Sequence, residues 1–195
     1  MTPVLLYDKI KVFFLNTLCY NTFRTYLEVF ILFKIGDKIV YPVQGAGVID
    51  VIEEKEFHGK KQTYYNISLI NNSMKLTMPF QRLQDSNIRL ISTSSTLDNV
   101  LLNISNYEDI ANKLCKCNSK ERLEINNNKL KSGSLEDIVE VILTLNKTKK
   151  IHSLNSSENQ VLLKAKKILT DEICLAKDIS KTEAIDLVDS TFNIS

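Results

Sequence analysis

The chain has 195 residues, of which 44% are hydrophobic and 25% are charged, and its formal net charge is +2 at pH 7. This composition is typical of one or two folded domains and argues against intrinsic disorder. So small a net charge does not by itself indicate a nucleic-acid-binding protein. The charge is unevenly distributed, because residues 113–167 hold twelve Lys or Arg against six Asp or Glu, and residues 168–195 hold two against six. The basic segment suits phosphate contact, although a solvated helix face is the commoner meaning of such a run.

The first thirty-two residues are rich in aromatic and aliphatic side chains. Arg24 and Glu28 interrupt this segment before it reaches the length of a membrane span. Few positive charges precede the apolar part and no small-residue cleavage site follows it, so a signal peptide is not indicated. We expect residues 1–32 to be an extension outside the folded domains, and we expect no membrane association.

The pattern of residues 33–91 predicts a small β-barrel. Proline lacks the amide that a strand ladder needs, so Pro42 ends a first short strand and Pro79 ends a later one. Gly45 and Gly47 allow the second strand to bend sharply, and Gly59 lies in a hairpin turn. Five short strands suit a small closed or half-open barrel. We expect them at residues 39–41, 48–52, 64–70, 74–78 and 88–91.

Residues 92–96, rich in Ser and Thr, are interpreted as a linker, after which the apolar period becomes that of helices. Residues 97–192 predict a compact bundle of five or six helices. Gly133 is placed to end one helix, and Ser134 with Asp137 resembles a capping box for the next. Asn155 or Ser156 caps a long helix, and Ser180 with Glu183 caps the last one. The predicted fold class is therefore α+β, a small β-barrel followed by an all-α helical bundle.

Catalytic motifs are missing from the sequence. There is no glycine-rich phosphate loop, no nucleophile elbow and no paired His-Glu metal motif. Cys115 and Cys117 form a C-x-C pair that could join His58 or His152 around a metal, but ordinary buried cysteines are the favoured interpretation because a second pair is lacking. The four cysteines also lack the spacing of a disulfide framework. We therefore expect a binding protein without catalytic activity, cofactor or metal.

Taken together, these segments resemble the CarD/CdnL family of bacterial transcription regulators, whose first domain is shared with transcription-repair coupling factors. The resemblance covers about residues 33–190. It is carried by FKIGDKIVYP at Phe33–Pro42, GAGVI at Gly45–Ile49, the turn at Gly59, MKLTMP at Met74–Pro79, KLKSG at Lys129–Gly133 and the helical pattern of Leu154–Leu169. Because the helical half matches too, a stand-alone regulator is favoured over a fragment of a coupling factor.

The resemblance implies an SH3-like or Tudor-like barrel that docks on the β subunit of RNA polymerase, and a helical domain that touches promoter DNA near the open bubble. Such a protein would alter open-complex stability, act as a monomer, and lie in the cytoplasm, associated with the nucleoid through polymerase. The implied polymerase contacts are Lys55, Glu56, Phe57 and Thr77. The DNA-contacting candidates, from the resemblance and the basic segment, are Ser119, Lys120, Arg122, Lys129, Lys131, Lys149, Lys150, Lys164, Lys166 and Lys167.

Three positions depart from the family pattern. Many members have a tryptophan wedge just after an Asn, whereas here Asn118 is followed by Ser119 and the chain contains no Trp. Glu121 and Thr77 stand where basic residues are often found. We therefore expect phosphate-dominated DNA contact with little wedge action. The alternative is a polymerase- or protein-binding module without productive DNA contact.

The resemblance also bears on the extension. Family members begin within one or two residues of the position of Phe33, so Leu32 could be a misassigned alternative start codon. A genuine but weakly ordered extension is the other interpretation of residues 1–31.

Overall fold

The computed structural model describes residues 33–193 except residue 58 and residues 71–74. The described residues belong to one compact unit that begins at Phe33. Both expectations for the extension concern residues outside this described part, as does the connection at residues 71–73 between two of the expected strands.

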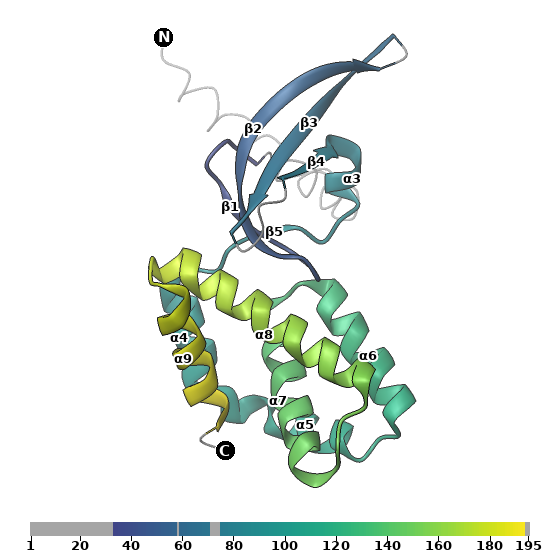
Figure 1. Cartoon of the computed structure of the whole chain (residues 1–195), viewed down its shortest axis with the longest axis vertical. Coiled ribbons are helices and arrows are strands. Elements are labelled where there is room, and N and C mark those ends of the chain that lie inside the picture. Colours follow the sequence, from purple (N-terminus) through teal and green to yellow (C-terminus); the bar gives the residue numbers. More distant parts are fainter. Residues whose placement is uncertain (1–32, 58, 71–74, 194–195) are drawn as a thin grey trace, which may run out of the picture. The chain divides into compact units, whose positions relative to one another are not determined.

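Five antiparallel strands form one sheet in the order β4-β3-β2-β1-β5, and Figure 1 shows β2 and β3 as a long curved hairpin. A register shift between Ile49 and Val51 marks a bulge, which helps to bend β2. The predicted small β domain, expected as a barrel of five short strands, is present as this five-stranded antiparallel sheet, with a longer hairpin than the sequence suggested. The strands are β1 (Lys38–Tyr41), β2 (Gly45–Phe57), β3 (Lys60–Leu69), β4 (Lys75–Pro79) and β5 (Arg89–Leu90).

One side of the sheet packs a small apolar core around Ile39, Ile49 and Ile67, which are fully buried. A short helix, α3 (Phe80–Gln84), follows β4 directly and adds the buried Leu83 to this core. Helix α3 was not predicted, because a proline such as Pro79 also ends a strand. Proline is equally suited to the entry of a helix, and Pro79 is the N-cap of α3.

The remaining described elements are helical and confirm the predicted bundle. Helix α4 begins at Ser94, where the Thr93 hydroxyl accepts a hydrogen bond from the Thr96 amide. Ser94–Thr96, three of the residues interpreted as a linker, are therefore its first turn. The helices are α4 (Ser94–Leu102), the 3₁₀ helix η2 (Ile104–Tyr107), α5 (Glu108–Cys115), α6 (Ser119–Ser132), α7 (Leu135–Ile151), α8 (Ser156–Lys177) and α9 (Lys181–Asn193).

The expected helix ends are present. Asn155 forms a full capping box with Glu158 at the start of α8. Gly133 ends α6 with a φ of 74°, a conformation that favours glycine. At the start of α7 the Ser134 hydroxyl accepts from the Asp137 amide. Local sequence signals therefore fix where these long helices begin and end.

The helical region (residues 94–193) has its own core, centred on α7. Most of this helix is buried, including Ile138, Ile142 and Leu145. Two sheet residues, Val40 and Ala46, belong to the same core. The end of β1 and the start of β2 therefore contribute apolar side chains from the sheet region (residues 33–91) to the core of the helical region.

Candidate functional site

Two of the implied polymerase contacts are joined by a chain of polar side chains across three neighbouring strands. The Thr77 hydroxyl on β4 donates to Asn66 Oδ1 on β3 at 2.5 Å, and Asn66 Nδ2 donates to Glu53 Oε1 on β2 at 2.8 Å. Lys55 Nζ lies 2.9 Å from the same Glu53 oxygen. We call Lys55, Glu53, Asn66 and Thr77 the sheet network.

The register explains why these residues meet. Asn66 lies directly opposite Thr77, and it lies opposite Val51, two residues from Glu53. Direct and diagonal cross-strand neighbours are close enough for polar side chains to bond. Lys55 Nζ also lies 5.6 Å from the centre of the Tyr64 ring, a cation–π distance. The sheet network therefore offers an ammonium, a carboxylate and a hydroxyl on one partly exposed face.

Glu53 supplies the negative charge of this face, and its neighbours favour the ionised carboxylate. The hydrogen bonds from Lys55 and then from Asn66 lower the pKa of its carboxyl below the ordinary 4.5, against a smaller opposing effect of burial. Sequence reasoning missed Glu53 and Asn66 as site residues. The available signal was the i, i+2 spacing of Glu53 and Lys55, which places both on one face of a strand.

The two other implied polymerase contacts lie at the tip of the hairpin. Glu56 is exposed and pairs with Lys61 in the β2–β3 ladder. Phe57 is the last residue of β2, and its side chain lies outside the described part of the structure. Among the described residues, the Glu56 side chain makes no hydrogen bond or ion pair with the sheet network.

The turn before α6 is the place where the family resemblance expects a tryptophan. Asn118 is the N-cap of α6, and its side chain accepts from the Glu121 amide at 2.9 Å. Ser119 and Lys120 follow in the first turn and are exposed. Glu121 is exposed too, so a carboxylate lies at the helix end that would otherwise attract a phosphate.

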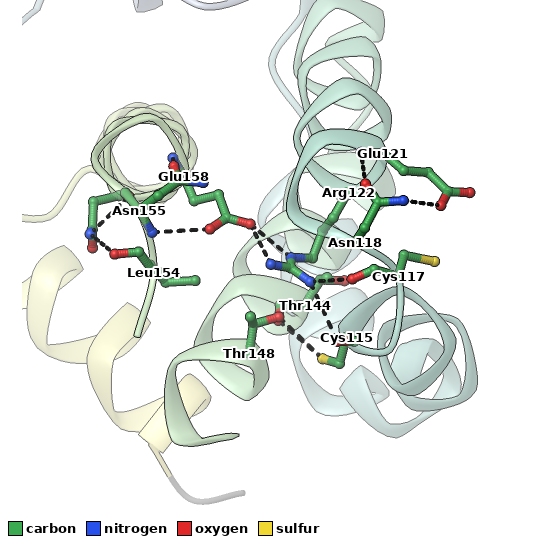
Figure 2. Close-up of polar contacts among 11 residues, drawn as sticks. Cys115, Cys117, Asn118, Glu121, Arg122, Thr144, Thr148, Leu154, Asn155 and Glu158 are labelled. Carbon is green, nitrogen blue, oxygen red and sulfur yellow. Dashed lines mark hydrogen bonds and ion pairs between the residues drawn. The ribbon is translucent and has the colours of Figure 1, made fainter. Parts of the chain in front are cut away.

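Arg122 does not face solvent. It is 5% exposed and points into the bundle, where Figure 2 shows its guanidinium among Glu158, Cys115 and Cys117. Its Nε and Nη2 lie 2.8 and 2.6 Å from Glu158 Oε1, and its Nη1 donates to the Cys117 carbonyl at 2.7 Å. The expectation that Arg122 contacts DNA is therefore corrected, because its donors are used inside the protein.

This buried pair connects three elements. Arg122 belongs to α6, and its Nη1 donates to the Cys115 carbonyl at the end of α5 and to the Cys117 carbonyl in the turn after it. Glu158 belongs to the first turn of α8, where it completes the capping box with Asn155. The guanidinium thus fixes the turn that presents Ser119 and Lys120. Its role is to position that turn.

The other candidate DNA-contacting bases form two groups, those that are paired with an acidic side chain and those that are not. Lys129 pairs with Glu140, Lys166 with Asp189, and Lys167 with Asp171. Burial lowers the pKa of Lys129, and the nearby Asp137 carboxylate opposes this shift. The remaining five, Lys120, Lys131, Lys149, Lys150 and Lys164, are exposed and form no ion pair with any described residue. These five, from α6, α7 and α8, are called the exposed lysines.

The cysteines considered as metal ligands are placed differently. Cys115 is buried, and the Thr148 hydroxyl donates to its sulfur at 3.4 Å (Figure 2). Cys117 is partly exposed, and its thiol lies near the Lys113 carbonyl. Across the described ranges, no three His, Cys, Asp or Glu side chains gather as metal ligands. Nor is any described helix both long and apolar enough to cross a bilayer.

An antiparallel sheet followed by a helical bundle, with a polar face on the first and exposed lysines on the second, defines a binding protein of two regions. Two family models match these regions. Residues 33–92 match the CarD-like/TRCF RID domain, which is an RNA polymerase-interacting domain, and residues 109–189 match the CarD C-terminal domain.

A curated relative agrees with both matches. The chain is 36% identical over 152 residues to a Bacillus subtilis (strain 168) protein described as "Putative transcription factor YdeB". The alignment covers 78% of this chain and 97% of the relative. The chain therefore belongs to the CarD/CdnL family of transcription regulators, which is not an enzyme family.

Proposed function

We propose that this protein regulates transcription by docking on the β subunit of RNA polymerase through its sheet region while its helical region contacts promoter DNA near the open bubble. In doing so it alters open-complex stability, as a monomer and without catalysis. The proposal rests chiefly on one observation, that a polymerase-interacting domain and a CarD C-terminal domain lie in one chain. A transcription regulator of this kind works in the cytoplasm, at the nucleoid.

The sheet network is the proposed centre of the docking face. Its hydrogen bonds hold Lys55 and Thr77 in place before a partner arrives, which lowers the entropy cost of binding. Glu56 and Phe57 at the end of β2 extend this face toward the hairpin tip. Thr77 has no charge, so Lys55 and Glu53 are the charged groups that select the partner.

The exposed lysines are the proposed DNA contacts. A lysine already paired inside the protein must break that pair to meet a phosphate, whereas Lys120 and Lys164 have no such cost. Such contacts are independent of sequence and weaken with salt. Docking on polymerase raises their effective concentration at the promoter, which allows individually weak contacts to matter.

Charge reversal tests this division of labour. We expect Lys120→Glu with Lys164→Glu to leave co-purification with the polymerase β lobe unchanged and to reduce the effect on open-complex lifetime. Lys181→Glu, a single charge reversal at the exposed start of α9, is the control for the kind of substitution and should leave both unchanged. Loss of β-lobe binding in the double variant would contradict the proposal.

A second function is favoured by the α6 turn. Ser119 cannot wedge between bases, and the exposed Glu121 carboxylate repels phosphate. The protein would then bind polymerase, or another protein, without productive DNA contact. Binding to the β lobe combined with an unchanged open-complex lifetime, in wild type and double variant alike, would identify this alternative.

A further inference from the structure

A buried ion pair joins the sheet region to the helical region. Arg89 on β5 makes a two-pronged contact with Glu172 on α8, with Nη1–Oε1 and Nη2–Oε2 distances of 2.6 and 2.8 Å. The Glu172 side chain is fully buried, and that of Arg89 is 25% exposed. Paired geometry of this kind fixes the relative orientation of its two partners.

The same two side chains bind the backbone on both sides. Arg89 Nε donates to the Gly133 carbonyl, between α6 and α7, at 2.6 Å. The Ser92 amide, just after the sheet region, donates to Glu172 Oε1 at 2.8 Å. Four elements or turns are therefore held around one carboxylate and one guanidinium.

A second contact lies at the turn between β1 and β2. Lys167 Nζ on α8 donates to the Gln44 carbonyl at 2.8 Å. At the neighbouring Gly45, an added Cβ would lie 2.5 Å from Asp171 Oδ2 and 2.9 Å from Lys167 Nζ, so these two side chains would have to shift to admit it. Its φ of 124° also favours glycine. This turn is thus fitted closely against α8.

The apolar core continues through the same junction. Val40 and Ala46, on either side of that turn, are fully buried in the core of the helical region. Ion pair, backbone contacts and shared core all act between the sheet region and α8. Relative motion of the two regions would break all three, so the junction resists it.

We propose that Arg89, Glu172 and Gly45 are positioning residues that make the two regions one rigid body, so that docking of the sheet on polymerase sets where the exposed lysines lie on DNA. This inference rests on the proposed function. It adds a structural reason why docking of the sheet region on polymerase would determine the position of the exposed lysines. None of the three residues belongs to the sheet network or to the exposed lysines.

The rigid connection is tested on the full chain in solution, without polymerase. Residual dipolar couplings of backbone amides in the sheet and helical regions should fit one alignment tensor in the wild type. Glu172→Gln removes the charge at nearly the same shape and should require two tensors. Glu140→Gln removes the partner of Lys129 within the helical region and is the matched control, which should keep one tensor.

The positioning role is tested on promoter complexes. Glu172→Gln should change affinity for the β lobe by less than about twofold, as expected for a distant site. At saturating protein its effect on open-complex lifetime should be lost, while Glu140→Gln keeps the effect. Arg89→Lys retains the positive charge and one hydrogen bond. This variant should therefore keep part of the wild-type effect on open-complex lifetime.

If Glu172→Gln does not fold, Gly45→Ala disturbs the same junction without removing a charge and should give the same pair of results. The inference is overturned if the wild type needs two tensors, or if an uncoupled variant affects lifetime as the wild type does. A wild-type protein that binds the β lobe without changing lifetime would instead refute the proposed function, while the tensors still decide whether the regions are joined.

Discussion

Arg122 and Glu158 show how one buried pair supports an exposed turn. Glu158→Gln would leave the Arg122 guanidinium buried without its carboxylate, and breaking a buried pair in this way costs about 3–5 kcal/mol. We expect that loss in the free energy of unfolding measured by urea denaturation. Lys120→Gln, an exposed neighbour, should change it by less than about 0.5 kcal/mol. Equal stability of the two variants would contradict the buried pair.

Glu53 provides a second test at the scale of single residues. Because its folded pKa lies below the ordinary 4.5, its contribution to stability is fully present above 4.5 and is lost as pH falls through the folded value. An NMR titration of its carboxyl carbon should give a midpoint below 4.5. Lys55→Met should raise that midpoint more than Asn66→Ala, since Lys55 is the larger cause. A midpoint at 4.5 in the wild type would contradict the sheet network.

At the scale of elements, the first turn of α6 has space for the aromatic side chain that the family resemblance expects, but the residue there is Ser119. Ser119 is exposed at the first helical position after the Asn118 cap, so a larger side chain fits there without disturbing the core. We expect Ser119→Trp to lengthen open-complex lifetime, because an inserted ring offsets part of the cost of unstacking a base step. Ser119→Ala is the control and should have no effect. An unchanged promoter-melting assay for Ser119→Trp would count against the alignment of this turn with the family's tryptophan position.

The elements show what the sequence could predict. Strand β4 was found because Leu76 and Met78 alternate with polar residues, and α8 was found because Asn155 and its apolar period mark it. Helix α3 was missed, since five residues after a proline carry too little periodicity. Local patterns therefore determine the long elements.

The site was harder to predict because charge in a sequence does not indicate burial. Arg122 was grouped with solvent-facing bases, although it lies four residues before the buried Asn126 and eight before the buried Leu130, on one face of α6. That spacing was the available signal. The partners of Arg122 and Arg89, Glu158 and Glu172, are 36 and 83 residues away, and no local pattern reveals such pairs.

At the scale of the whole molecule, DNA contact should depend on salt through the exposed lysines. Each phosphate contact contributes about −0.9 to the slope of log affinity against log salt on duplex DNA. We expect Lys164→Gln to reduce the slope of the protein-dependent change in open-complex lifetime by about one. Lys166→Gln, whose side chain is already paired with Asp189, is the matched control and should leave that slope unchanged. Equal slopes for Lys164→Gln and the wild type would show that Lys164 does not contact DNA phosphates.

The junction around Glu172 also orders events during synthesis. The last strand, β5, ends at Leu90, so the sheet region can emerge from the ribosome while α8 is still unmade. Until then Arg89 has no carboxylate, and Lys38 lacks its acceptor, the Leu175 carbonyl. A nascent chain arrested before residue 172 would therefore contain the sheet region without these two contacts. The contacts that join the sheet region to the helical region can therefore form only late in synthesis, once α8 has been made.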